Sequence, residues 1–69
     1  LYFIDFIEMK NDKIRRNAMI IKKARGKMLN QMILKEITTL DEIKNLNISG
    51  FIYDNTLSSN QTLTFVKKE

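Results

Sequence analysis

The chain has 69 residues, of which 43% are apolar, and its 12 Lys and Arg residues exceed its 8 Asp and Glu residues, for a net charge of +4. Because it contains no Cys and no His, disulfides, the usual zinc sites and the Ser-His-Asp and Cys-His catalytic arrangements are excluded. Its two glycines do not make a glycine-rich phosphate loop, so we expect no cofactor and no metal, and the sequence does not indicate an enzyme.

Residues 1–9 are expected to form the first strand, because seven of these nine positions are apolar. This composition suits a strand that is buried on both faces, with a short helix as the alternative. Asp5 and Glu8 make the run too short for a membrane span and too acidic for a signal peptide. We therefore expect a cytoplasmic protein without a transmembrane segment. Residue 1 is not Met, so residues 1–8 could also be an addition before a native start at Met9.

Residues 12–37 are the longest helical candidate, and no Pro interrupts them. Basic residues directly before Gly26 are typical of a helix end, so we favour two helices, roughly 12–25 and 27–37, over one rod about 39 Å long. The helical period predicts a core stripe on one face, formed by Ile14, Ala18, Ile21, Ala24, Met28, Leu29 and Met32. Met19, Ile20 and Leu34 fall outside this stripe, which makes them candidates for a dimer seam or another partner contact.

Residues 39–42, TLDE, match a capping box. The Thr39 hydroxyl can accept the amide of Glu42, and the Glu42 carboxylate can reach back to the amide of Thr39. A short helix over about 40–46 should follow. The whole stretch 38–55 resembles a helix-turn-helix, but its second half lacks Lys and Arg and carries aromatic and β-branched residues. We therefore favour a capped helix that turns into a strand.

Residues 51–53 and 62–66 are rich in β-formers, and the turn-forming residues 54–61 lie between them. This pattern predicts a β-hairpin with a long tip. In the second arm, Leu63 and Phe65 alternate with Thr and Val residues, which predicts one buried face and one partly wet face. Tyr53 is expected to be a half-buried strand residue rather than an active-site hydroxyl.

The fold expected from these elements is a single small α+β domain over residues 1–69. It would contain an N-terminal strand, two or three helices and a C-terminal β-hairpin. This order is compatible with a winged-helix domain and equally with a small sheet-plus-helices domain of the kind that small ribonuclease toxins use.

Charge is distributed unevenly along the chain. Eight basic residues and no acidic residue lie between Lys13 and Lys35, whereas residues 37–69 carry three basic and four acidic residues. Like charges repel each other, and a polyphosphate would relieve that repulsion with release of counterions. We expect contacts with the backbone of DNA or RNA rather than base readout. The candidate contacts are Arg15, Arg16, Lys22, Lys23, Arg25, Lys27, Lys67 and Lys68.

The function expected is thus that of a small basic nucleic-acid-binding protein, such as a transcriptional, plasmid or phage regulator. The first alternative is a protein-interaction module that forms a homodimer through Met19, Ile20 and Leu34 or docks on an acidic partner. The second alternative is a small metal-independent ribonuclease toxin. A plain solvated helix and an anionic lipid surface remain further explanations of the basic run.

Overall fold

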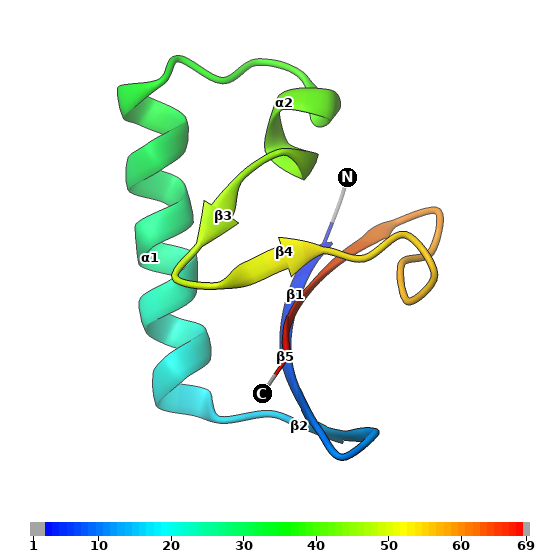
Figure 1. Cartoon of the computed structure of the whole chain (residues 1–69). Coiled ribbons are helices and arrows are strands. Elements are labelled where there is room, and N and C mark those ends of the chain that lie inside the picture. Colours follow the sequence, from blue (N-terminus) through cyan, green and yellow to red (C-terminus); the bar gives the residue numbers. More distant parts are fainter. Residues whose placement is uncertain (1–2, 69) are drawn as a thin grey trace.

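The computed structural model of the chain describes residues 3–68, which form a five-stranded sheet and two helices (Figure 1). The expected α+β class, with a small sheet and helices, is therefore confirmed. In chain order the elements are β1 (Phe3–Lys10), β2 (Lys13–Arg15), α1 (Ala18–Leu34), α2 (Leu40–Lys44), β3 (Asn47–Ile48), β4 (Phe51–Tyr53) and β5 (Thr62–Lys68). Neither helix of the described residues is long and apolar enough to cross a membrane.

The sheet has the strand order β2-β1-β5-β4-β3. Its two central strands, β1 and β5, come from opposite ends of the chain and run parallel, with Phe6 opposite Phe65. All other neighbouring strands are antiparallel. The predicted N-terminal strand is confirmed over residues 3–9, while residues 1–2 of that prediction lie outside the described residues. The predicted pairing of residues 51–53 with the 62–66 arm is also confirmed. The parallel pair needs a long crossover, which the two helices and β3–β4 supply.

The prediction of two helices, roughly 12–25 and 27–37, is wrong. Residues 11–12 form a turn with φ of 51° and 63°, and residues 13–15 return as β2. The helix begins only at Ala18, after Asn17, whose side chain accepts the amides of Met19 and Ile20. Asn17 is a favourable N-cap that the sequence analysis did not use.

Gly26 does not break α1, which runs as one helix of 17 residues from Ala18 to Leu34. A glycine lowers helix propensity but leaves the backbone hydrogen bonds intact. The apolar face on both sides of Gly26 packs on one continuous sheet surface, and this packing holds the helix together.

The buried stripe of α1 differs in part from the predicted one. Ala24 and Met28 are buried, and Ile20, Ile21 and Met32 pack partly against the core. Ile20 was expected outside the stripe, while Leu29, expected inside it, has 61% of its surface exposed. The predicted face was aligned on Ile14, which lies in β2 and not in the helix, so the centre of the stripe was misplaced.

The hydrophobic core lies between α1 and one face of the sheet. The ring of Phe6 packs edge-on against Phe51, with 5.3 Å between ring centroids, and lies 5.6 Å from Phe65. Tyr53 is half-buried and packs edge-on against Phe65, as expected for a strand tyrosine. The buried residues of the core are Phe6, Ala24, Met28, Leu46, Ile48, Phe51, Leu63 and Phe65.

The capping box at α2 is confirmed, with one difference. Thr39 Oγ1 accepts the amide of Glu42 at 3.3 Å, as predicted, but it also donates to the Glu42 carboxylate at 2.9 Å. The carboxylate thus bonds the Thr39 hydroxyl instead of the Thr39 amide. Helix α2 ends at Lys44, and the chain then enters β3, so residues 38–55 form a capped helix followed by strands, as favoured.

A two-residue turn, Ser49-Gly50, connects β3 and β4. Both residues have positive φ, 53° and 94°, as the common two-residue hairpin turns require. This short hairpin packs beside α1, and the later hairpin of β4 and β5 joins the same sheet (Figure 1).

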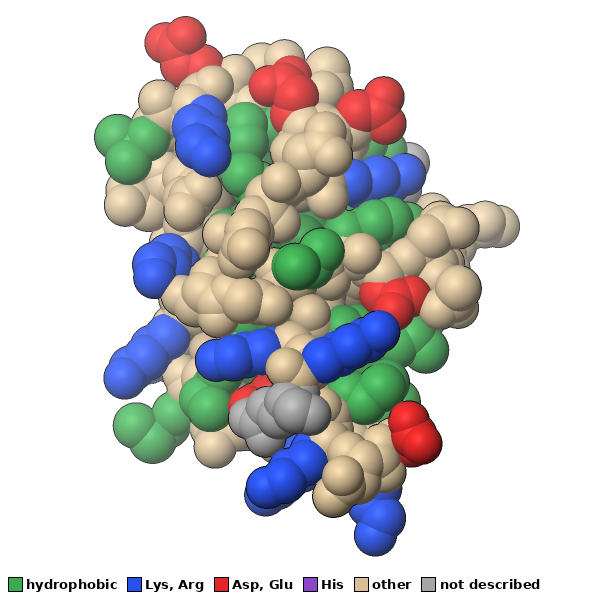
Figure 2. Space-filling view, in the orientation of Figure 1, with side chains coloured by type: hydrophobic (Ala, Val, Ile, Leu, Met, Phe, Trp, Pro, Cys, Tyr) green, Lys and Arg blue, Asp and Glu red, His purple; other side chains and the backbone are tan. Residues whose placement is uncertain are grey.

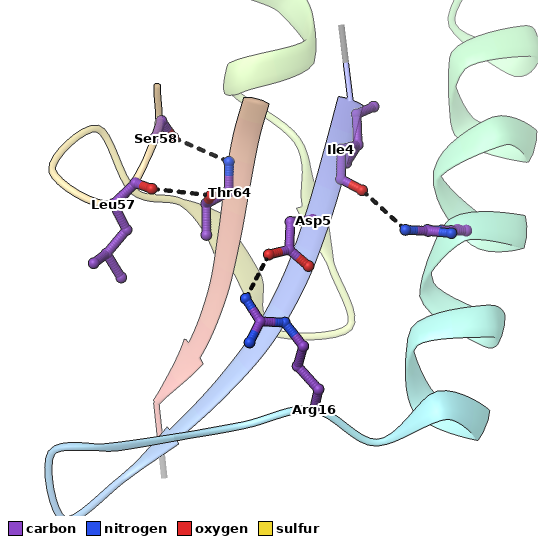
Figure 3. Close-up of polar contacts among 7 residues, drawn as sticks. Ile4, Asp5, Arg16, Leu57, Ser58 and Thr64 are labelled. Carbon is purple, nitrogen blue, oxygen red and sulfur yellow. Dashed lines mark hydrogen bonds and ion pairs between the residues drawn. The ribbon is translucent and has the colours of Figure 1, made fainter. Parts of the chain in front are cut away.

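The predicted wet face of the second hairpin arm is wrong for residues 63–66, which are all buried. The hairpin tip folds back over Thr64, the one polar residue among them. The Thr64 amide donates to Ser58 Oγ at 3.0 Å, and the Thr64 hydroxyl donates to the carbonyl of Leu57 at 3.2 Å (Figure 3). The hairpin tip therefore covers the face of β5 that carries Thr64, and the core covers the opposite face.

Candidate nucleic-acid interface

Figure 2 shows positive and negative side chains intermixed over much of one face of the molecule. Acidic side chains lie at the top, over α2 and the loop that precedes it, and others lie lower down on the right and near the end of β5. Lys and Arg side chains predominate along α1 and around the end of β5, and some also lie near the top. The separation along the sequence is thus partly kept in space on this face.

Two lysines of α1 and one of β5 come together beside the Ser49-Gly50 turn. Lys23 and Lys27 are one helical turn apart, so they project from the same face of α1, and Lys27 Nζ donates to Ser49 Oγ at 2.6 Å. The stem of Lys67 lies against Gly50, where a Cβ would be 3.4 Å from Cε. We call Lys23, Lys27 and Lys67 the lysine cluster. The β3–β4 turn is the element that brings them together.

The lysine cluster surrounds a hollow of about 420 Å³, which we call the lysine pocket. Among residues 3–68, its lining contains three cations and no acidic residue. Most of its surface is apolar, and Gly26 contributes bare helix backbone. The lining residues are Ile20, Lys23, Ala24, Gly26, Lys27, Ser49, Phe51 and Lys67.

Lys22 and Lys68, also predicted as contacts, do not line the pocket. Lys22 is exposed on α1. Lys68 is exposed on β5 and lines a neighbouring hollow together with Asp54. Lys68 is therefore partly matched by a nearby negative charge. Lys67 is the register partner of Glu8 in β1, so a carboxylate also neighbours the lysine cluster, although it does not line the pocket.

Asp54 is held by the tip of the second hairpin. Its Oδ1 accepts the Thr56 hydroxyl at 2.6 Å, the Thr56 amide at 2.9 Å and the Leu57 amide at 3.2 Å. The hydrogen bond from the Thr56 hydroxyl lowers the pKa of the Asp54 carboxyl most, with smaller contributions from the two amides and from the charge of Lys68. Asp54 therefore stays ionised, and its expected role in the turn is confirmed.

Arg16 lies on the opposite face of the sheet and is neutralised within the chain. Its guanidinium donates to Asp5 Oδ2 of β1 at 2.9 Å (Figure 3). This hydrogen bond and the charge of the carboxylate raise the pKa of Arg16. Within residues 3–68, this is the one ion pair between side chains at 4 Å or less.

The other two arginines are also separated from the lysine cluster. Arg25 donates to the carbonyl of Ile4 at 3.3 Å and so ties α1 to β1. Arg15 is exposed at the end of β2 that is farther from the β1–β2 turn, and it is the register partner of Glu8. The eight basic residues proposed from the sequence thus divide among the pocket, the sheet edge and the far sheet face.

The three apolar residues proposed as a partner seam do not share one surface. Met19 and Leu34 are 72% and 73% exposed, but they stand fifteen residues apart on α1, which is about 22 Å along the axis. Ile20 packs against the core instead. Leu29, which was expected in the buried stripe, and Ile33, which was not proposed, are instead exposed one turn apart on the same helix.

Ser49 and Gly26 line the pocket but were not proposed from the sequence, nor was Gly50, which lies beside the pocket in the same turn as Ser49. The dipeptide Ser-Gly between two short β-rich runs is a recognisable hairpin signal, and it could have located the turn. No local signal indicates that Lys67 would reach this turn, because that depends on the pairing of β4 with β5. In residues 3–68, no group of three or more potential metal ligands of the His, Cys, Asp or Glu type is present.

Comparison with known proteins identifies the family of the chain. The family model described as "Peroxide stress protein YaaA" matches residues 1–57. A UPF0246 protein of Streptococcus agalactiae serotype Ia is 44% identical over 69 residues, which is 100% of this chain and 28% of that protein. UPF0246 proteins of Streptococcus sanguinis and Streptococcus pneumoniae are 40% and 37% identical over 91% and 94% of this chain and 26% and 27% of their own lengths.

The chain belongs to the peroxide stress protein YaaA family. It spans about 28% of the length of the relatives from Streptococcus agalactiae. Because the match to those relatives covers all 69 residues, residues 1–8 are part of the family sequence, and the alternative that they were added before Met9 is wrong.

Proposed function

We propose that this member of the YaaA family binds nucleic acid through the lysine cluster. The observation that carries the proposal is the convergence of Lys23, Lys27 and Lys67 from two distant segments around a pocket without an acidic lining residue. Three ammonium groups held near each other repel, and phosphate groups relieve this repulsion. Lys22 is also exposed on α1 and would add to the positive charge of the helix.

The arrangement suits backbone contacts more than base readout. Lysine ammonium groups are mobile point charges that accept many phosphate geometries. The arginines, which favour bidentate recognition, are engaged elsewhere: Arg16 with Asp5 and Arg25 with the Ile4 carbonyl. We therefore expect sequence-independent binding, with Arg15 as a separate contact at the sheet edge and Lys68 weakened by Asp54.

A salt titration tests the mechanism. Binding of the chain to labelled duplex DNA and to single-stranded RNA would be measured by fluorescence anisotropy at two or more salt concentrations. Three phosphate contacts predict a slope of log K against log salt near about −2.7 for duplex DNA. Binding that does not change with salt would contradict the electrostatic mechanism for both nucleic acids.

Substitution of the cluster locates the contacts. The variant K23Q/K27Q/K67Q should bind at least about tenfold more weakly, and each lost contact should reduce the salt slope by about one. Lys35→Gln is the matched control, because Lys35 is an exposed residue at the end of α1, outside the lysine pocket. If the control weakened binding as much per charge as the cluster variant, net charge alone would account for the affinity.

The proposal assigns this segment one part of a larger protein. The family description names peroxide stress, and we propose that nucleic-acid binding in the cytoplasm is the contribution of these residues to such a response. The rest of the family polypeptide would supply the other activities, since the chain spans only about 28% of the relatives.

A second candidate function is docking on that remaining polypeptide, and a different surface favours it. Leu29 is 61% exposed and lines a hollow of about 390 Å³ between α1 and β1, with Phe3, Met28 and Met32. Ile33, one turn further along α1, is also exposed. Exposed apolar surface of this kind marks an interaction site, and the unmatched length of the relatives supplies a natural occupant.

Mixing the chain with the unmatched part of the Streptococcus agalactiae relative tests the docking. A complex should form by gel filtration, and Leu29→Gln should weaken it, whereas Leu57→Gln, on the hairpin tip, should not. Self-association of the chain without the second polypeptide would favour the homodimer instead.

A further inference from the structure

We infer that the lysine pocket holds a single nucleotide of a bound strand, with its phosphate among the three lysines and its sugar or base against the apolar wall. The inference rests on the proposed nucleic-acid binding and adds a defined ligand unit at that site. Three features of the pocket support it: the glycine in its wall, its polar rim and its apolar floor.

Gly26 is the first feature, because nothing within the chain requires a glycine there. It lies in the interior of α1, where glycine weakens a helix more than any residue except proline. A Cβ at this position would meet no atom within 4 Å, so packing does not exclude a side chain. The α-helical backbone does not require glycine either. What a side chain would obstruct is the pocket, and glycine commonly serves where a ligand approaches the backbone closely.

The rim supplies donors suited to a phosphate. Lys23, Lys27 and Lys67 contribute ammonium groups. Ser49 Oγ accepts from Lys27, so its hydroxyl proton is available for donation. The Gly50 amide, by contrast, is already bonded to Asn47 Oδ1 at 2.9 Å. The phosphate would therefore be held by side chains, through charge-assisted hydrogen bonds.

The floor distinguishes a nucleotide from a simple anion. Most of the lining surface is apolar. Ala24 and Phe51 are 4% and 1% exposed, so the accessible part is formed by Ile20 and by the methylene stems of the lysines, and the stem of Lys67 covers Gly50 beside it. A free phosphate ion would leave this surface unused. An acidic peptide would present small carboxylates on flexible stems, whereas a nucleotide joins one phosphate to a rigid ring. The volume of about 420 Å³ lies in the range of small-molecule sites.

Titration with adenosine 5′-monophosphate, followed by amide chemical shifts of the chain at low salt, tests the inference directly. Saturable shifts should concentrate at Gly26, Ser49, Gly50 and the lysine cluster, and inorganic phosphate should bind several-fold more weakly. The inference is overturned by an absence of binding, by shifts that centre on Lys13 and Arg15, or by equal affinity for inorganic phosphate. Equal competition by hexaglutamate would show an acidic-peptide site and would also overturn it.

Gly26→Ala provides a signature that a structural role would not produce. The variant should have a higher melting temperature, because alanine favours helix, and yet bind adenosine 5′-monophosphate at least fivefold more weakly. Asn30→Ala is the matched control, since Asn30 is exposed on α1 outside the pocket. It should also raise the melting temperature but leave the affinity unchanged. Unchanged nucleotide affinity in the Gly26 variant would refute the inference.

The two proposals fail in different ways. If the wild-type chain binds oligonucleotides with a steep salt dependence but not the mononucleotide, the nucleic-acid proposal stands and the pocket inference fails. If the chain binds neither, both fail. Gly26→Ala should keep the salt slope of oligonucleotide binding, because it removes no charge.

Discussion

The polar groups on the two faces of the sheet differ in the partners that they find within the chain. On the face away from α1, Arg16 pairs with Asp5, and Thr64 bonds both Ser58 and Leu57 (Figure 3). On the α1 side, the lysine cluster gathers three cations around the lysine pocket without a carboxylate in its lining. Polar groups satisfied by one another contribute to folding, whereas like charges gathered around a hollow favour an anionic ligand.

The first prediction concerns Phe51, which lies beneath the lysine pocket. Phe51 is buried in the pocket wall and packs edge-on against Phe6. Phe51→Ala should lower the free energy of unfolding by about 3–5 kcal/mol, which is comparable to the whole stability of a domain of this size. Urea denaturation followed by circular dichroism would measure this loss.

Ile52→Ala is the neighbouring control, because Ile52 belongs to the same strand but is 55% exposed on the other side of the sheet. Its loss should stay below about 1 kcal/mol. Equal losses for the two variants would mean that the pocket floor is not part of the core.

The second prediction contrasts the two glycines beside the lysine cluster. Gly50 has a φ of +94°, a region that other residues rarely adopt, and a Cβ there would be in ordinary contact with Lys67 at 3.4 Å. Gly50→Ala should therefore destabilise the chain by about 1–2 kcal/mol through backbone strain. Gly26→Ala should stabilise it by about 0.5–1 kcal/mol.

Thermal denaturation of the two alanine variants measures both effects under the same conditions. Changes of opposite sign would separate a glycine needed by the backbone from a glycine that only leaves space. A destabilising Gly26→Ala would show that the helix backbone or its packing needs this glycine after all.

The third prediction concerns the loss of the Arg16–Asp5 ion pair on the face of the sheet away from α1. Arg16 is 59% exposed and Asp5 is 28% exposed at the side chain, so solvent screens their attraction. Arg16→Gln should cost only about 0.2–1 kcal/mol of stability, and it should change oligonucleotide affinity less than twofold. A double-mutant cycle with Asp5→Asn, in urea, isolates the pair. A large loss of oligonucleotide affinity in Arg16→Gln would extend the interface to this face.

The sequence predicted those elements whose signals are local. The cap at Thr39, the strand in residues 1–9 and the pairing of residues 51–53 with the 62–66 arm follow from composition and spacing. The helical stripe was predicted less well. The single apolar residue of residues 13–15 fits the period of a strand and also that of a helix, so the start of the helix was placed too early. The turn at Asn11 and Asp12 ends the strand, and both residues have positive φ. The spacing of the apolar residues does not indicate this turn.

The site could be predicted only in part for a similar reason. The basic run showed which residues are charged, but not which charges the fold neutralises. Arg16 is neutralised because the β1–β2 turn returns the chain alongside β1, where Asp5 lies. Lys67 joins Lys27 because β5 pairs with β4 and the Ser49 turn meets α1. These contacts depend on strand register, which the order of charges along the chain does not contain.

The fourth and smallest effect concerns Asp54, where the two faces meet at the hairpin tip. Its pKa is lowered in the folded chain, chiefly by the Thr56 hydroxyl, so the ionised carboxylate stabilises the fold. That contribution is fully present above the ordinary Asp pKa of about 3.9 and is lost as the pH falls below it. Between pH 5 and pH 3, the wild-type chain should therefore lose more stability than Asp54→Asn in parallel urea titrations.

The same substitution decides whether Lys68 belongs to the nucleic-acid interface. Asp54 lies close enough to Lys68 for their charges to interact, so removing the carboxylate frees that lysine. At neutral pH and low salt, Asp54→Asn should raise oligonucleotide affinity by about twofold if Lys68 contacts phosphate, as expected for one exposed charge pair. The double variant D54N/K68Q should not show this gain. Unchanged affinity in Asp54→Asn would mean that Lys68 does not contact phosphate. Lys67 would then be the last residue of β5 in the interface.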